Sequence, residues 1–142
     1  MYYTPGKIEE LSREDIDRIL AKAVFGRLGL AFENEAYVVP VWHRYDGQRI
    51  WFHIGKEGKT TTYLQANRQA CFEVDELTDQ GWWSVICYGT VTLSDSIDSK
   101  REILRVSGAE APSDDQLEQM QIFVCILTPD EMTGRKSPGY VV

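Results

Sequence analysis

The residues best suited to chemistry lie in one stretch, between Tyr37 and Thr60. A run rich in β-branched and aromatic residues, interrupted by Pro40, leads into a hairpin, and a turn rich in Gly, Lys and Thr follows it. Free backbone amides at the start of a helix attract anions. Lys59 would add a full positive charge to such a start, Thr60 a hydroxyl donor, and His53 points to the same end of the hairpin. These residues fit a phosphate site, and they fit a solvated loop with a flexible lysine equally well.

Four other residues allow both a functional and a structural interpretation. His43 lies on a predicted strand, where a histidine is more often structural or exposed than catalytic. Trp82 and Trp83 could stack on a base or a flavin, but adjacent strand residues point to opposite faces, so at most one of them can do so. We favour the alternative, with one in the core and the other on a dimer surface. Arg135 either reaches across a dimer to an anionic ligand or belongs to a solvated basic tail.

Composition restricts the class of protein. The chain has 142 residues, 43 % hydrophobic and 26 % charged, which fits a single soluble domain over residues 1–142. The net charge of −7 argues against general nucleic-acid binding. No segment has the length of a membrane-spanning helix, and the first fifteen residues lack the apolar core of a signal peptide. We therefore expect a cytoplasmic protein without nucleic-acid or membrane partners.

The cysteines give no sign of a metal or disulfide framework. Cys71, Cys87 and Cys125 are odd in number and widely spaced, and each lies in an apolar run. We interpret them as buried thiols in a reducing compartment.

Alternation of apolar residues and turn signals predict a mainly β fold with three helices. Ser12 is the expected N-cap of the first helix, a short helix ends near Asn67, and a third runs from Ser99 to Val106. Asp46-Gly47 is expected as a type I′ turn, and the residues from Thr133 to Val142 as a polar tail, mobile or ordered against a partner subunit. The six predicted strands, whose spacing favours a closed barrel, are Phe25–Phe32, Ala36–Tyr45, Arg49–Ile54, Ala70–Val74, Trp82–Leu93 and Gln121–Leu127.

A longer motif carries a family resemblance. The run VVPVWHRYDGQRIWFHIGKEGKT, followed by CFEVDE and SVICYGTV, resembles the FMN-binding split barrels related to pyridoxamine-phosphate oxidase, and among them the nitroimidazole-resistance branch. The similarity extends over about residues 8–95. Its specific part is the combination of a proline in the second strand, a YDG hairpin, FH before a GxK turn, and two later strands.

The resemblance implies a six-stranded split β-barrel with flanking helices, acting as a homodimer with FMN at the subunit interface. The second strand would run along the isoalloxazine ring, the third strand and its turn would bind the ribityl phosphate, and the fifth strand would contribute one residue near the flavin. The implied FMN-binding residues are Val39, Pro40, Val41 and Trp42 on the second strand, Phe52, His53, Lys59 and Thr60 around the turn, and Ser84 on the fifth strand.

The chain departs from the oxidases that give the group its name. Those enzymes carry an arginine before the strand that corresponds to Val38-Val39, and an arginine-lysine pair where this chain has Gly58-Lys59. The carboxy-terminal segment with arginine and histidine that completes their vitamin site has no clear match. Oxidation of pyridoxamine phosphate is therefore not expected.

The expected function is that of an FMN-dependent oxidoreductase acting on a small organic acceptor, for which the resemblance implies a nitroaromatic such as a nitroimidazole. No residue stands out as catalytic, which suits chemistry that resides in the cofactor. One alternative is a flavin store, sensor or electron carrier without enzymatic activity. Another is a barrel that binds haem or a deazaflavin, with His43 or His53 as the candidate axial ligand for haem.

Overall fold

The computed structural model describes residues 6–142. The first five residues, part of the amino-terminal segment used above to argue against a signal peptide, lie outside the described residues. The helices are α1 (Arg13–Lys22), α2 (Lys59–Ala66), α3 (Ile97–Val106) and α4 (Asp114–Gln119). The strands are β1 (Glu9–Glu10), β2 (Phe25–Phe32), β3 (Glu35–Trp42), β4 (Arg44–Tyr45), β5 (Ile50–Gly55), β6 (Gln69–Thr78), β7 (Gly81–Ser94) and β8 (Ile122–Lys136).

All eight strands form one curled antiparallel sheet. Its order is β3-β2-β6-β7-β8-β5-β4, and β1 pairs with the end of β8. The two end strands, β3 and β4, are consecutive in the chain and are separated only by His43. The hydrogen-bonded ladder does not close between them, so the fold is a split barrel, mainly β with flanking helices, and the closed barrel favoured by strand spacing is wrong. The six predicted strands are present, but the predicted strand Ala36–Tyr45 is divided at His43 into β3 and β4, and β1 is added as a strand of two residues.

The inward side chains form one continuous core. Phe52, Phe72, Leu28 and Leu64 are at most 1 % exposed and pack together inside the barrel. The predicted alternation along β5 is confirmed, because Ile50, Phe52 and Ile54 are buried in this core while His53 is exposed.

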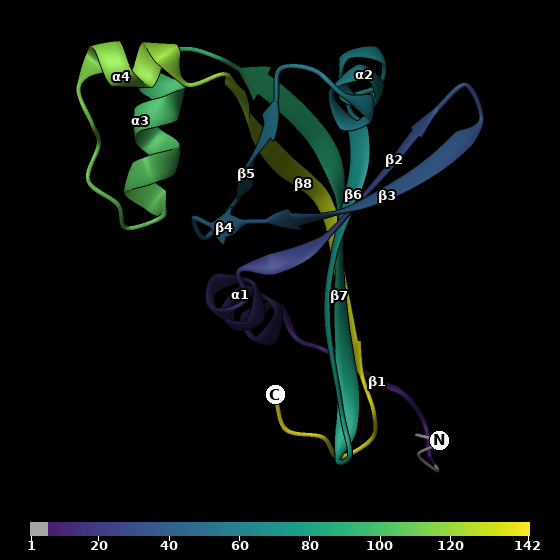
Figure 1. The fold of residues 1–142 in the computed structure, drawn as a ribbon. Coiled ribbons are helices and arrows are strands. Elements are labelled where there is room, and N and C mark those ends of the chain that lie inside the picture. Colours follow the sequence, from purple (N-terminus) through teal and green to yellow (C-terminus); the bar gives the residue numbers. More distant parts are fainter. Residues whose placement is uncertain (1–5) are drawn as a thin grey trace.

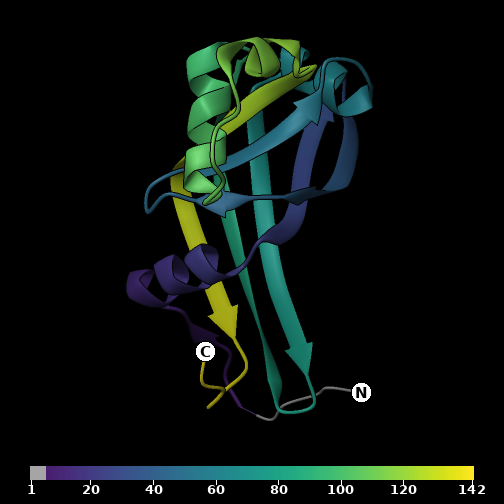
Figure 2. The same ribbon diagram turned by 60° about the vertical axis from the view of Figure 1, so that its left-hand side comes forward.

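Each helix covers a different part of the barrel. Ser12 caps α1 as predicted, its hydroxyl accepting from the amide of Asp15 at 3.1 Å. A second, smaller core of Trp51, Ile103 and Val124 lies between α3 and the outer side of β5 and β8. Figures 1 and 2 show α1, α3 and α4 on one side of the long strands β6, β7 and β8. The outer side of β3, β2, β6 and β7 has no helix packed on it among the described residues.

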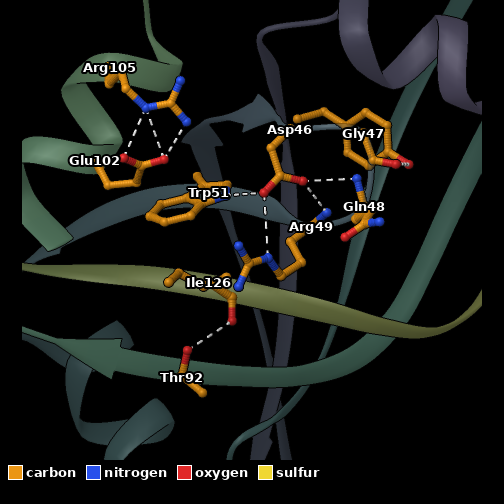
Figure 3. Close-up of polar contacts among 10 residues, drawn as sticks. Asp46, Gly47, Gln48, Arg49, Trp51, Thr92, Glu102, Arg105 and Ile126 are labelled. Atoms are coloured by element: carbon orange, nitrogen blue, oxygen red, sulfur yellow. Dashed lines mark hydrogen bonds and ion pairs between the residues drawn. The ribbon is translucent and has the colours of Figure 1, made fainter.

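The loop between β4 and β5 is held by one carboxylate. Asp46 accepts from the amides of Gln48 (2.8 Å) and Arg49 (2.6 Å) and from Nε1 of Trp51 (2.8 Å), as Figure 3 shows. Gly47, at φ 97°, is the residue of this loop with positive φ. The type I′ turn centred on Asp46-Gly47 is therefore wrong. Asp46 precedes the central pair and organises the loop with its side chain, as Asp commonly does in turns.

The predicted last strand is too short. β8 continues nine residues past Leu127, because a bulge opposite Tyr88 and Gly89 accommodates Pro129 without ending the ladder. Proline usually ends a strand, which is why the prediction stopped there. Thr133 to Lys136 therefore belong to β8 and not to a tail.

Residues 137–142 fold back onto their own chain. Ser137 is fully buried, and its hydroxyl accepts from the amide of Trp82 at 3.0 Å. Tyr140 donates its hydroxyl to Glu76, and Arg18 of α1 donates to the carbonyl of Val142. Neither tail prediction, mobile or ordered by a partner, describes this segment.

Two helices differ from the prediction. α3 begins at Ile97, two residues early, because Ser96 is its N-cap. α4 is not among the three predicted helices. A reciprocal capping box between Ser113 and Gln116 starts it, and the buried Leu117 anchors it.

Candidate functional site

The start of α2 presents unbonded backbone amides. Its N-cap is Gly58, at φ 124°, and no side chain caps it. The first helical bond runs from the amide of Thr62 to the carbonyl of Gly58, so the amides of Lys59, Thr60 and Thr61 have no partner within the helix. Those amides favour an anion. The predicted phosphate site thus has a free helix start with Lys59 as its first residue.

Two tyrosine rings position the ammonium of Lys59. Its Nζ lies 4.8 Å from the ring centroid of Tyr37 on β3 and 5.6 Å from that of Tyr63 on α2. Tyr63 donates its hydroxyl to Glu35 at 3.1 Å, and burial together with this bond raises the pKa of Tyr63. Cation–π contacts of this kind hold the lysine without neutralising it. The charge of Lys59 therefore stays available to a ligand.

Sequence reasoning missed the two tyrosines. Tyr63 stands four residues after Lys59, and residues at this spacing share one helix face. Tyr37 stands two residues before Val39, so both lie on one face of β3. These two spacings could have identified the cluster. Thr60 also reaches Tyr37, with 3.5 Å between the two hydroxyl oxygens.

The four predicted residues of β3 divide between its two faces. Val39 and Val41 point inward and pack on the core, while Pro40 and Trp42 are exposed on the outer face. Within the part of the chain that the structure describes, β3 is an edge strand paired with β2 alone. From Tyr37 beside Lys59 to Trp42 it spans about 17 Å. The strand therefore offers a free backbone edge that starts at the candidate phosphate site.

The two predicted residues of β5 also point in opposite directions. Phe52 is 1 % exposed, so its side chain belongs to the core and only its backbone remains for a ligand. His53 is exposed on the outer side of the strand. The structure thus brings together Lys59, Thr60 and the beginning of β3, and it leaves the side chain of Phe52 outside this group.

Ser84 lies in a separate cleft. It is on the outer face of β7, paired with Arg135 of β8, and it lines a cleft of about 700 Å³. Trp82 and Tyr88 line the same cleft, whereas Trp83 points inward and packs on the core. None of the other predicted flavin-binding residues borders it, because β2 and β6 separate β7 from β3. Arg135 is an exposed strand residue at this cleft.

His43 is buried and does not fit a haem ligand. Its ring is 2 % exposed, packs edge-on against Phe72 at 4.6 Å, and has no hydrogen-bond partner at either nitrogen. Burial lowers the pKa of His43 to about 4. It does not line the cleft that contains Ser84, nor the clefts that contain Val38 and Arg18. The structural interpretation of His43 agrees with this placement.

The cysteines are free thiols. Cys87 and Cys125 are fully buried, and burial raises the pKa of each to about 12. Cys71 is half-buried on the outer face of β6.

Within residues 6–142, no group of three or more His, Cys, Asp or Glu side chains has a metal-binding arrangement. No helix in that range has the length and apolar character needed to cross a membrane.

Comparison with protein families gives a match over most of the chain. A family model described as pyridoxamine 5'-phosphate oxidase matches residues 12–136. The chain belongs to this family. The match to the family runs from the N-cap of α1 to the last residue of β8, and it includes α2, β3 and β7. A comparison with curated protein sequences finds no significant match.

Solved structures share the fold of the family. A candidate 5-nitroimidazole antibiotic resistance protein from Bacteroides thetaiotaomicron aligns with a TM-score of 0.80 at 24 % identity, covering 96 % of this chain and 92 % of that one. A FAD-binding protein from Mesorhizobium loti aligns at 0.72 and 22 % identity, covering 91 % and 97 %. A FAD- and haem-binding protein from Mycobacterium smegmatis aligns at 0.73 and 17 % identity, covering 96 % and 76 %. At these identities the likeness concerns the fold.

Proposed function

We propose that this protein binds a flavin, specifically FMN, between the start of α2 and the free edge of β3. The observation that carries the proposal is the uncapped start of α2, with Lys59 held over Tyr37 beside that edge. The donor set fits a phosphate monoester, since it combines three backbone amides, one ammonium and the hydroxyl of Thr60. Flavin-binding relatives with the same fold support it.

Pro40 is compatible with this placement. It lacks an amide donor, and it lies in an edge strand where no neighbouring strand requires one. The amides of Val39 and Val41 point toward β2, whereas the amides of Val38 and Trp42 point to the free edge and would serve the polar edge of the ring system. When bound, the flavin would supply the redox chemistry, and the residues of this chain would bind and orient it.

We propose further that the active form is a homodimer. Ser84, Trp82 and Arg135 lie in a cleft on the outer face of β7, which two strands separate from β3. A second copy that places this cleft over β3 would bring Ser84 next to the other predicted residues. The outer face also exposes Val38 (66 %) and Trp42 (64 %) on β3, which suits a covered surface.

The proposed activity is electron transfer from the reduced flavin to a small organic acceptor, with nitroaromatics such as nitroimidazoles as the first class to examine. The fold shared with the Bacteroides protein motivates this choice. The test is anaerobic reduction of the loaded protein followed by addition of a nitroimidazole. Reoxidation no faster than with buffer would remove the nitroreductase proposal and leave a flavin carrier.

Lys59→Ala tests the phosphate site, and Lys56→Ala is its matched control. Lys56 lies in the same loop, but its ammonium is already paired with Asp95 at 2.6 Å. We expect Lys59→Ala to weaken FMN binding about tenfold or more, measured by quenching of flavin fluorescence, because a charge-assisted hydrogen bond contributes roughly 1.5–3 kcal/mol. Lys56→Ala should bind like the parent.

Riboflavin lacks the phosphate of FMN, so a comparison of the two binding affinities shows whether Lys59 contacts the phosphate. The parent should prefer FMN over riboflavin, and Lys59→Ala should lose most of this preference. Equal affinity of the two lysine variants for FMN would refute the assignment of the phosphate to α2.

A further inference from the structure

The outer side of β3, β2, β6 and β7 is an uncovered surface, which we call the open face. Strand pairing places its side chains in transverse rows. One row begins with Trp42 and Phe25, which pack edge to face at 5.3 Å. Another contains Val38, Cys71 and Tyr88. Phe25 is 48 % and Tyr88 44 % exposed, so both rows present large apolar groups to solvent.

A charged cluster lies between these apolar rows. Arg27 of β2 donates from Nη1 to Glu73 at 3.2 Å and to Asp75 at 3.1 Å, both on β6. The other strand neighbours in the row of Glu73 are uncharged, Pro40 on β3 and Ile86 on β7. One guanidinium thus faces two carboxylates, and the fully ionised cluster carries a net charge of −1.

Burial and the neighbouring Asp75 raise the pKa of Glu73 to about 7, against the opposing effect of Arg27. The pair of carboxylates therefore holds one proton below about pH 7 and releases it above. With that proton bound, the cluster is electrically neutral.

A twofold dimer would bring this cluster against its own copy. The candidate flavin site is at the β3 side of the open face, and the cleft with Ser84 is at the β7 side. If β3 of one copy meets β7 of the other, the strands between them, β2 and β6, lie at the symmetry axis. Arg27, Glu73 and Asp75 of the two copies then face each other across the interface. Two clusters of charge −1 would repel in a desolvated contact, whereas two neutral clusters would not.

We propose that assembly of the homodimer through the open face takes up a proton at the Arg27–Glu73–Asp75 cluster of each subunit. This inference rests on the homodimer of the proposed function, and it adds a regulation by pH. Covering the cluster removes water from it and favours the protonated form further. The dimer is therefore tight below neutral pH and loosens above it.

The direction of the pH dependence follows from the linkage between proton binding and dimer formation. At pH 6 the cluster is protonated in the monomer and in the dimer, so the dissociation constant is flat there. Above pH 7 the monomer loses the proton while the dimer still holds it, and the dissociation constant rises. Between pH 6 and pH 8.5 we expect a rise of about tenfold or more.

Sedimentation equilibrium of the purified protein at pH 6, 7 and 8.5 measures this dependence. Glu73→Gln imitates the protonated carboxyl, so its dimer should be equally tight at all three pH values. Asp75→Asn removes the opposing carboxylate and should also tighten the dimer at pH 8.5. Glu118→Gln makes the same chemical change on the exposed side of α4 and should behave like the parent.

The outcomes separate the two proposals. A parent dimer with one dissociation constant from pH 6 to pH 8.5 overturns the proton linkage and leaves the homodimer standing. A rise with pH that persists in Glu73→Gln overturns the assignment to this cluster. A monomer at every pH overturns the homodimer and the inference with it.

Discussion

The two faces of the sheet formed by β3, β2, β6 and β7 differ in what covers them. Neighbouring inward positions carry Val39, Leu28, Phe72 and Cys87, and all of them pack in one core. The outward positions one residue away carry Pro40, Arg27, Glu73 and Ile86. The same strands thus present a closed apolar layer on one side and a mixed, open surface on the other.

This difference assigns separate tasks to the two faces. The inward face determines how the chain folds, because its apolar groups leave water only when the barrel forms. The outward face leaves large apolar groups exposed after folding, which is typical of a surface that binds something else. Substitutions should therefore affect stability on one side and assembly on the other.

The largest effect is expected for a core substitution. Phe72→Ala empties the space between β2, β7 and His43, and it should lower the free energy of unfolding by about 3–5 kcal/mol. Urea unfolding at pH 8.5 and low protein concentration measures this. Phe25→Ala, which truncates an aromatic ring on the open face, should cost less than about 1 kcal/mol under the same conditions. Similar losses for the two variants would contradict the division between the faces.

A second prediction concerns His43, the polar exception on the inward face. Burial lowers the pKa of its ring to about 4, and Arg44 is the charged group acting on it, also in the lowering direction. Between pH 6.5 and pH 4 the unfolded chain gains a proton that the folded chain does not. Stability is therefore complete above pH 6.5 and falls by about 3 kcal/mol on acidification to pH 4.

The variant His43→Phe isolates this contribution. Its free energy of unfolding should fall less than that of the parent between pH 7 and pH 4, and the difference between the two is the quantity to measure by urea titration. His53→Gln, which changes the exposed histidine, should keep the parent's fall. Parallel pH profiles of His43→Phe and the parent would show that the buried ring does not titrate as described.

The smallest of the three effects compares two polar clusters. Asp46→Ala leaves two loop amides and the indole of Trp51 without their acceptor, and it should cost about 2 kcal/mol. Arg27→Ala removes two solvent-accessible ion pairs, with Glu73 and Asp75, and should cost less than about 1 kcal/mol. Thermal unfolding at pH 8.5 ranks the two. An equal loss would mean that the open-face cluster also stabilises the subunit fold.

The sequence predicted the parts of the fold that a local pattern determines. The alternation of Ile50, Phe52 and Ile54 identified β5, and Ser12 marked the start of α1. The continuation of β8 past Pro129 depends on a bulge in β8 opposite Tyr88 and Gly89 of β7, which no local pattern shows. α4 has a single buried apolar residue, Leu117, and therefore gave no periodic signal.

The candidate site was predictable to a similar degree. The Gly58-Lys59 turn before a short helix was visible in the sequence, and its placement as the uncapped start of α2 agrees with that expectation. That Ser84 would lie apart from Lys59 was not visible, because it depends on the order of the strands across the sheet. The alternation of Phe52 with His53 along the strand predicted that Phe52 points inward. Only the family motif placed Phe52 near the ligand.

The junction at His43 has a consequence for the motions of the barrel. Since β3 and β4 meet through one residue and not through a ladder, the outer edge of β3 is a seam whose amides have no strand partner in the single subunit. Those amides should exchange their hydrogens with solvent much faster than the amides of β6 or β7, which pair on both sides. A ligand or a second subunit bound along this edge would slow the exchange. Deuterium uptake by the amides of β3 would therefore report whether the edge is free or bound.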